Sequence, residues 1–328
     1  MKKAIIRLLG FVILLIVVLN IFILATWDKQ YEAPMPNLKA TNDSAMIARG
    51  AYLVYGPAHC ASCHAPFEKK DAVKNGEQID LIGGWEMCIP PADVRAPNIT
   101  PDKETGIGNM SDGQIARAMR YSVQHDGKIL LPFMPFQELS DEDVIAILSY
   151  LRSRPAVKNV IPRTEYKFLG KALLAFGAIT PVGPNKTPFK SILKDTTFEY
   201  GEYIANSVAN CVGCHTKRDL KTGKYIGPPF AGGFYFAPDK YSQGFSFITP
   251  NITPDKETGI MAQWDQTTFI NRFKAGRVHQ GSHMPWETMG RIDEIELKAL
   301  YQYLMHIKPV NNKIEKIVFE PGEVYAEK

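Results

Sequence analysis

Two copies of the motif Cys-x-x-Cys-His constrain this chain more than any other feature of its sequence. The first copy, CASCH, occupies residues 60–64, the second, CVGCH, occupies residues 211–215, and Cys88 is the fifth cysteine. A disulfide framework would favour an even number of cysteines at varied spacings. A zinc site would need a second ligand pair downstream of each motif, and none follows. A thioredoxin-type motif would lie in a strand–turn–helix context that neither copy has.

The histidine that follows each cysteine pair indicates covalent haem attachment. In this motif the two thiols add across the vinyl groups of one haem, and the adjacent imidazole is placed to bind the iron. One match would be moderately specific, whereas two in one chain are strong evidence. We therefore predict two covalently bound haem c groups.

A haem with histidine on one face needs a ligand on the other, and two methionines are candidates. Met134 lies in LPFMPF and Met284 lies in SHMPW, at nearly the same distance from the preceding motif. Each is followed by a proline and an aromatic residue. A thioether ligand favours Fe(II) and raises the reduction potential, as expected of an electron carrier. His283 is a rival to Met284, but its counterpart Phe133 cannot bind iron, so we favour the methionine.

The chain contains an internal repeat with a period of about 150 residues, which makes it two copies of one module. The segment PNITPDKETGI occurs at residues 97–107 and again, without a change, at residues 250–260. Such a segment could be a plain surface turn. Because loops on rigid scaffolds carry function, we instead predict that Asn98 and Asn251 contact haem propionates.

Helical periodicity and N-cap residues predict an all-α fold in both copies. Gly50, repeated at Gly201, would let another helix approach closely. Alternating apolar patterns are missing, so strands should be scarce. Helices are expected at residues 44–55, with Ser44 as N-cap, 111–123 and 140–153, and in the second copy at 196–206, 264–275 and 291–306.

The N-terminus has the composition of a membrane anchor. Three basic residues accompany an apolar run over residues 8–25, which as a helix would span roughly 27 Å at ~1.5 Å per residue. A cleaved signal peptide is the alternative, but its apolar region is usually shorter, and Ile23 occupies a cleavage position that prefers a small residue. Trp27 fits an interfacial anchor. We predict an uncleaved transmembrane helix at residues 1–27, with the rest of the chain exported.

The remaining regions divide the chain further. Modules at residues 28–154 and 196–328 are joined by a linker at 155–195, which is too long to be a bare connector. We expect its apolar residues to pack across the module interface, the alternative being a position on the membrane near the anchor.

The net charge of +4 is scattered without a basic cluster, so we predict no nucleic-acid partner. Cys88 is expected to be a buried, inert residue; a minor alternative makes it a haem ligand in place of Met134.

At the level of motifs, the chain resembles the class I cytochrome c fold in tandem. More specifically, it resembles the haem c subunits of bacterial membrane-bound dehydrogenases for alcohols, aldehydes and sugar acids. The segments RGAYLV with CASCH, PNITPDKETGIG and LPFMPF carry this resemblance, which covers residues 44–154 and 196–308. The resemblance implies four thioether cysteines, two proximal histidines and two distal methionines: Cys60, Cys63, Cys211 and Cys214, His64 and His215, Met134 and Met284.

Two departures from the family pattern are visible. In many class I cytochromes a Gly-Pro after the haem motif lends its proline carbonyl to the ligand histidine. Gly227 and Pro228 fit this role in the second half, whereas the first half has DLIGG and no proline, which leaves the partner of His64 open. Well-known relatives carry three modules, and this chain has two with a membrane helix.

Closed, six-coordinate haems would relay single electrons rather than bind a substrate. We therefore expect an electron-transfer protein on the periplasmic face of a bacterial cytoplasmic membrane, not an enzyme. Its partners would be a dehydrogenase subunit and a downstream oxidase or cytochrome. The alternative is a two-haem peroxidase, which needs one open haem face; two matching methionine loops argue against it. A haem-based sensor would carry a signalling domain, and we expect none in these residues.

Overall fold

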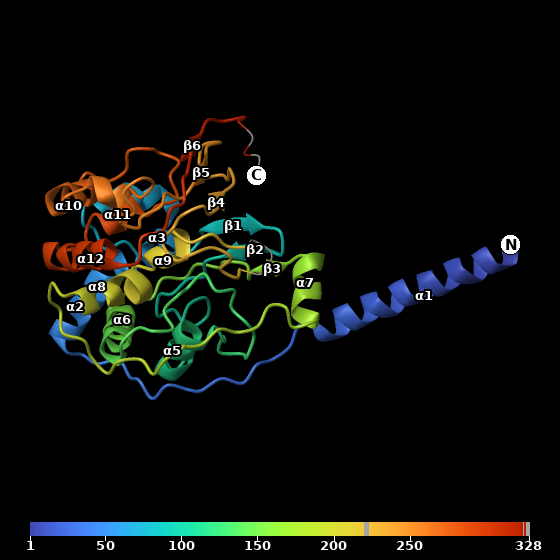
Figure 1. Ribbon diagram of the computed structural model, residues 1–328. Helices are drawn as coiled ribbons and strands as arrows, with labels where there is room; N and C mark the ends of the chain where they lie inside the picture. The colour runs from blue at the N-terminus through green and yellow to red at the C-terminus, as the bar shows by residue number, and fades with distance from the viewer. Residues whose placement is uncertain (220–222, 324, 326–328) are drawn as a thin grey trace.

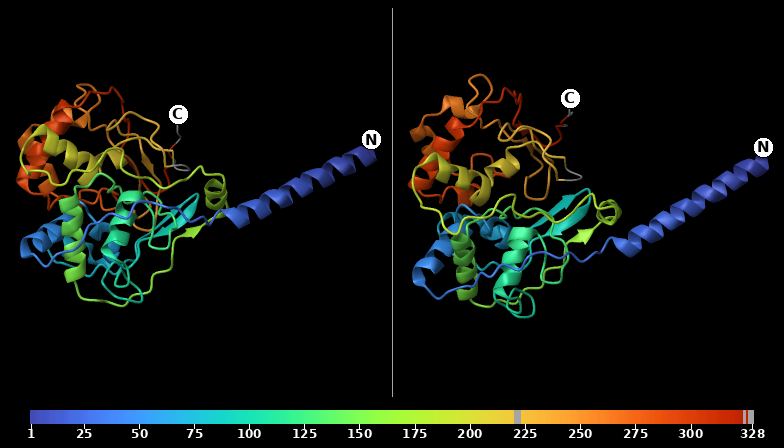
Figure 2. Two further views of the ribbon diagram at one scale, coloured as in Figure 1. Left: turned by 90° about the horizontal axis from the view of Figure 1, so that it is seen from below. Right: turned by 60° about the horizontal axis from the view of Figure 1, so that its bottom comes forward.

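The N-terminal helix stands apart from a body of short helices and small sheets. The computed structural model describes residues 1–219, 223–323 and 325. Helix α1 (Lys2–Thr26) projects away from the body in every view (Figures 1 and 2). It is the one helix among the described residues that is long and apolar enough to cross a membrane, a test that a signal sequence also passes.

Both halves of the body are built on a crossed pair of helices. In the first half, α2 (Ser44–Tyr55) packs on α6 (Asp141–Ser153), and in the second α8 (Phe198–Tyr203) packs on α12 (Glu294–His306). A Cβ on Gly50 would lie 1.9 Å from the carbonyl oxygen of Ala146, and one on Gly201 would lie 2.0 Å from that of Ala299. The predicted reason for these glycines is confirmed: the helices cross where a side chain would not fit.

Local capping explains where the helices begin. Ser111 forms a capping box at the start of α5 (Asp112–Tyr121), and Ser140 accepts a hydrogen bond from the backbone of Asp143. The cap of α2 is Asp43 rather than the predicted Ser44, because the Asp43 carboxylate accepts from two backbone N–H groups. The six predicted helices are all present. In the second half, α8 passes into a π-helical turn, η2 (Ile204–Val208), and α10 spans Gln266–Lys274.

Two small antiparallel sheets were not anticipated. The described residues form two sheets of three strands, in the orders β1-β2-β3 and β4-β5-β6. No strand exceeds four residues, so none leaves a readable alternation in the sequence, and the prediction of an all-α fold was incomplete. The strands are β1 (Glu86–Ile89), β2 (Ala92–Arg95), β3 (Glu165–Tyr166), β4 (Tyr235–Phe236), β5 (Ser246–Ile248) and β6 (Val318–Phe319).

The segment between the halves does more than connect them. Its helix α7 (Phe168–Ala175) packs beside the end of α1 and against a small cluster formed with Ile129 and Ile179. The expectation that its apolar residues pack across the module interface is therefore wrong for α7. Further along the segment, the carbonyl of Phe189 accepts a hydrogen bond from the backbone N–H of Asp141 at 2.8 Å, so this stretch lies beside the start of α6.

One continuous core joins the two halves. Buried residues from α2 and α6 lie in the same apolar cluster as residues from α8 and α12. The short elements that border this core are α3 (Ala61–His64), η1 (Phe67–Lys69), α4 (Lys70–Lys74), α9 (Cys211–Cys214), η3 (Ile260–Gln263) and α11 (Trp286–Met289). The halves therefore meet through a shared interior rather than through a surface contact.

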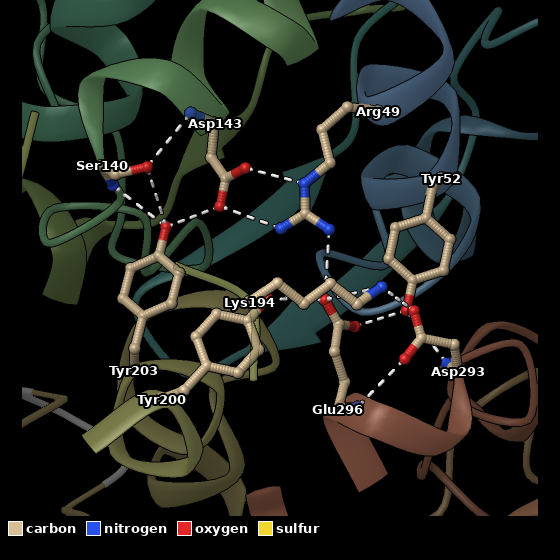
Figure 3. A network of polar contacts seen from close by, with 9 residues as sticks. All are labelled: Arg49, Tyr52, Ser140, Asp143, Lys194, Tyr200, Tyr203, Asp293 and Glu296. Atoms are coloured by element: carbon tan, nitrogen blue, oxygen red, sulfur yellow. Dashed lines mark hydrogen bonds and ion pairs between the residues drawn. The ribbon is translucent and has the colours of Figure 1, made fainter. Parts of the chain in front are cut away.

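A reciprocal pair of tyrosines crosses this interface (Figure 3). The Tyr203 hydroxyl from α8 accepts from the backbone N–H of Ser140 at 3.0 Å and donates to Asp143 at 2.7 Å, at the start of α6. The Tyr52 hydroxyl from α2 accepts from the backbone N–H of Asp293 at 3.0 Å and donates to Glu296, at the start of α12. Each half thus completes the capping of the last helix of the other.

Arg49 lies at the centre of the same network (Figure 3). Its Nε contacts Asp143 Oδ1 at 2.9 Å and its Nη1 contacts Glu296 Oε1 at 3.1 Å, so one guanidinium bridges the two halves. Tyr200, which occupies the position of Arg49 in the second copy, donates to the same Glu296 at 2.8 Å. Burial lowers the pKa of Arg49, but the two carboxylates outweigh that effect and raise it, so the ion pairs stay charged.

The helix crossing gives a first prediction. Replacing Gly50 or Gly201 with alanine places a methyl group closer to a backbone carbonyl than van der Waals contact allows. Each variant should therefore lose about 1–3 kcal/mol of unfolding free energy or more. Gly10→Ala is the matched control, because no atom lies within 4 Å of its new Cβ. Urea denaturation of the purified proteins measures the difference; equal midpoints for all three variants would contradict the crossing.

The interface gives a second prediction. Arg49→Leu should lower the unfolding free energy by about 3–5 kcal/mol, because it leaves the buried Asp143 carboxylate without its counter-charge. The control is Lys158→Met, which breaks an ion pair with Glu104 whose side chains are 65% and 70% exposed. That exposed pair should cost less than about 1 kcal/mol. An Arg49→Leu protein as stable as the control would show that the network does not hold the halves together.

Candidate haem sites

Each cysteine motif forms a single helical turn that gathers its reactive groups. In α3 the backbone N–H of His64 donates to the Cys60 carbonyl at 2.9 Å, and in α9 that of His215 donates to the Cys211 carbonyl at 2.9 Å. Residues at positions i, i+3 and i+4 share one face of a helical turn. Both thiols and the imidazole of each motif are therefore directed to the same side, as attachment to one planar group requires.

The two imidazoles are held by equivalent hydrogen bonds. His64 Nδ1 donates to the carbonyl of Pro97 at 2.8 Å, and His215 Nδ1 donates to the carbonyl of Pro250 at 3.0 Å. A carbonyl can only accept, so Nδ1 carries the hydrogen and the lone pair of Nε2 is left to bind a metal. The suggestion that Pro228 serves His215 is wrong. The imidazole N–H groups of both histidines bond instead to the carbonyl of the first residue of the repeated PNITPDKETGI segment.

The chemistry of these groups fits haem attachment better than a bare metal site. Burial lowers the pKa of His64 and His215, against a smaller opposing effect of the proline carbonyls, so the imidazoles stay neutral and able to ligate. Burial raises the pKa of Cys60, Cys63 and Cys211 to about 12, which disfavours thiolates. Among the described residues, no three His, Cys, Asp or Glu side chains are grouped to hold a metal ion.

The methionine loops both border the shared core. Met134 and Met284 are half-buried and pack against it. In the first half, Gln137 Nε2 donates to the carbonyl of Met134 at 3.2 Å. In the second, Arg277 Nη2 donates to the carbonyl of Met284 at 3.2 Å. Each loop is thus fixed through its backbone, which leaves the thioether free to act as a ligand.

An ion pair strengthens the second loop. Arg277 contacts Glu287 through two bonds of 2.7 and 2.6 Å, and the two side chains are only 14% and 12% exposed. Burial raises the pKa of Glu287, but the guanidinium outweighs it and holds that pKa below its ordinary value. The pair therefore remains charged near neutral pH and closes the loop that carries Met284.

His283, the rival ligand, is engaged through its Nε2, whereas its buried Nδ1 has no hydrogen-bond partner among the described residues. Its Nε2 lies 3.2 Å from Asp239 Oδ2, and its ring stacks on Phe236 with centroids 4.5 Å apart. These contacts favour Met284 as the ligand of the second site. The ligand assignment itself stays a prediction.

Asn98 and Asn251 are placed differently from the expectation. Asn98 is 2% exposed; its Nδ2 donates to Thr105 and to the Val157 carbonyl, and its Oδ1 accepts from the backbone and hydroxyl of Thr100. Asn251 makes the same set of contacts in the second half. Neither amide has a hydrogen-bonding group left for a haem propionate. Both instead brace the loop whose preceding proline carbonyl holds the histidine.

The two sites face each other across the interface. Ser62, inside the first motif, lies 3.3 Å from Thr288, which follows Met284 in the second half. Burial is the largest cause of the raised pKa of Cys63, and the charge of the nearby Cys214 is the second. These two cysteines of different motifs therefore lie within electrostatic reach of each other. Sequence reasoning did not anticipate this proximity, because it depends on how the halves pack.

Cys88 differs from the expectation. It is exposed on β1 rather than buried, and its thiol donates to Asp93 Oδ1 at 2.6 Å, across the β1–β2 pair. Its other neighbour is Lys167 at 3.9 Å, so its contacts belong to the sheet and not to the haem motif. His125, His279 and His306 are exposed.

Comparison with known proteins agrees with this geometry. Residues 47–155 match the cytochrome c family. The chain is 30% identical over 282 residues to the fructose dehydrogenase cytochrome subunit of Gluconobacter japonicus, covering 80% of this chain and 52% of that protein. It is 28% identical to the cytochrome c subunit of the quinone alcohol dehydrogenase of Gluconobacter oxydans, covering 72% and 48%. A diheme c-type cytochrome of Cereibacter sphaeroides is 25% identical, covering 62% and 66%.

These similarities establish a class of protein but not a whole activity. A cytochrome c domain holds haem c covalently, and the relatives are named as cytochrome subunits of dehydrogenases. The chain spans about half the length of the first two relatives.

The Arg277–Glu287 pair gives a third prediction. Arg277→Leu removes charge-assisted hydrogen bonds worth about 1.5–3 kcal/mol, so amide exchange in residues 277–289 should accelerate about tenfold or more. Hydrogen–deuterium exchange with mass spectrometry measures it. The loop at residues 128–137 of the same molecule is the internal control and should be unchanged. Equal exchange in wild type and variant would mean that the pair does not hold the Met284 loop.

Proposed function

We propose that this chain, which carries a cytochrome c domain at residues 47–155 and is related to cytochrome subunits of dehydrogenases, is a membrane-anchored dihaem cytochrome c. It would relay single electrons from a dehydrogenase to the respiratory chain. The domains would be residues 28–154 and 196–328, with residues 155–195 between them and residues 1–27 as the anchor. Covalently bound haem supplies a one-electron iron couple, and the protein supplies its ligands and surroundings.

The observation that carries the proposal is the equivalence of the two histidines. His64 and His215 each follow two cysteines on one helical turn, and each donates Nδ1–H to a proline carbonyl of the repeated segment. The family match covers the first half alone, so the same geometry in the second half is what supports a second haem. Both imidazoles are oriented by partners that raise their basicity as ligands.

Methionine ligation would close both sites to substrates. Met134 and Met284 lie on loops fixed by backbone hydrogen bonds, and His283 is engaged by Asp239. If His64 with Met134 and His215 with Met284 hold the two irons, these residues would leave no coordination position for oxygen or peroxide. The residues then hold the redox group and exclude water, while electrons enter and leave through the protein.

The arrangement of the halves suits transfer from one site to the other. The first motif meets the second half at Ser62, whose hydroxyl lies 3.3 Å from that of Thr288 in α11, and the Arg49 network fixes the halves in this arrangement. An anchor with its basic end in the cytoplasm would hold the body at the periplasmic face of the membrane. There a dehydrogenase subunit could donate, and an oxidase or a soluble cytochrome could accept, through small transient contacts.

Absorption spectroscopy tests the ligand assignment. The oxidised holoprotein should show the methionine-to-iron absorption band at about 695 nm, and Met134→Ala and Met284→Ala should each remove about half of the absorbance of that band. Met305→Ala is the control, because Met305 is also half-buried and packed on the core. The intact mass of the chain should correspond to two attached haems.

Two outcomes would contradict the proposal. If one site contributes no band and the reduced protein binds carbon monoxide, that site is open, and peroxide turnover becomes the activity to assay. If the mass corresponds to one haem, the second half does not attach the cofactor.

A further inference from the structure

Helix α7 presents uncovered apolar side chains next to the end of the N-terminal helix. Phe168 is 55% exposed, Leu169 is 38% exposed, and Phe176, at the C-cap, is 59% exposed. In Figure 1, α7 lies where α1 meets the body and runs across the direction of α1. The second figure shows the same junction from two other directions (Figure 2). These side chains therefore lie on the side of the body from which α1 projects.

The opposite side of α7 is firmly attached to the body. A Cβ on Gly170 would lie 2.1 Å from the carbonyl oxygen of Pro91, so the helix backbone rests directly on the β1–β2 turn. Leu174 is 1% exposed and packs with Ile129 and Ile179. The exposed residues are thus the outer face of a fixed helix rather than a loosely placed segment.

Contacts with α1 set the depth of α7 relative to a bilayer. The rings of Phe22 and Phe176 lie 5.4 Å apart, so these two residues share a layer. Lys171 Nζ lies 5.1 Å from the ring centre of Trp27, just past the end of α1. Lys29 Nζ donates to the Ala175 carbonyl at 3.0 Å and ties the end of α7 to the same junction.

The chemistry of these layers matches a membrane surface. Phe22 precedes the end of α1 by about one turn, roughly 6 Å, which for a spanning helix is just inside the hydrocarbon. Trp27 and Lys171 then lie at the level of the headgroups, where amphipathic aromatic and lysine side chains concentrate. Phe176 would be held among acyl chains and the ammonium group of Lys171 among phosphates, whereas Lys167 Nζ is paired with Asp93 Oδ1 at 2.8 Å. A short helix with apolar residues outward and lysines beside them fits this boundary.

We propose that α7 is a second membrane contact, which inserts Phe168, Leu169 and Phe176 into the headgroup–acyl boundary of the bilayer beside α1. The inference rests on the membrane anchor in the proposed function. Its consequence is orientational: one spanning helix lets the body swivel, whereas two contacts fix which face of the haem domains is turned toward the membrane. A lipid surface is favoured over a protein partner because the patch is continuous with the face of α1 that lipid would cover.

Spin labels at single cysteines test the proposal on the full-length holoprotein. In a Cys88→Ser background, nitroxides are attached to Leu169→Cys and Phe176→Cys, and the proteins are placed in phosphatidylethanolamine–phosphatidylglycerol vesicles. Collision with oxygen reports lipid, and collision with a water-soluble nickel chelate reports water. Leu14→Cys in α1 is the lipid reference. Val160→Cys and Leu193→Cys, at positions 73% and 80% exposed, are the water references.

The expected result is an oxygen-to-nickel collision ratio at positions 169 and 176 several-fold above that at positions 160 and 193. If position 14 reports lipid while 169 and 176 match the water references, the second contact is refuted and the anchor stands. If position 14 reports water or is missing from the mature chain, both the anchor and this inference fail. If 169 and 176 are shielded from both reagents and become accessible on dilution in lipid, a second copy covers them, which also overturns the proposal. Haem content and the spectrum of these variants report separately on the relay function.

Discussion

The buried guanidinium of Arg49 is the interaction on which the arrangement of the body depends. It carries one positive charge between two carboxylates, Asp143 in one half and Glu296 in the other. Glu296 is fully buried, so separating the halves would leave its carboxylate without the guanidinium that now neutralises it. Tyr52 and Tyr203 extend the constraint by capping the helices of opposite halves. The distance between the two cysteine motifs is therefore set by the interior, not by a flexible linker.

The two halves share a scaffold and differ at the ligand loops. Both bind their histidine through a proline carbonyl and brace that loop with a buried asparagine. The loops diverge: Met134 is fixed by a neutral glutamine, whereas Met284 is fixed by a charged, largely buried arginine. Charge and hydrogen bonding near a haem tune its potential, so the proposed sites would not be equivalent. Such a difference would give a direction to transfer between them.

A membrane position for α7 would connect the fold to the proposed partners. With α1 and α7 in one bilayer, the sheet of β1, β2 and β3 would lie near the membrane, because α7 rests on the turn between β1 and β2. The haem motifs lie in the helical part of the body, on the far side of α7 from α1 (Figure 1). A dehydrogenase or an oxidase in the same membrane would then meet a body held in one orientation.

The sequence by itself determined what is local. A motif of five residues fixes which thiols and imidazole share a helical turn, caps such as Ser111 and Ser140 fix helix starts, and the repeat reveals two equivalent halves. Only the tertiary structure decided what depends on distant segments. The partner of His215 is the carbonyl of Pro250 rather than that of Pro228 in the Gly-Pro near the motif, because loop closure, not spacing, selects the carbonyl. The exposure of Cys88 follows from strands too short to read, and the Arg49 bridge from packing between halves, which no local pattern encodes.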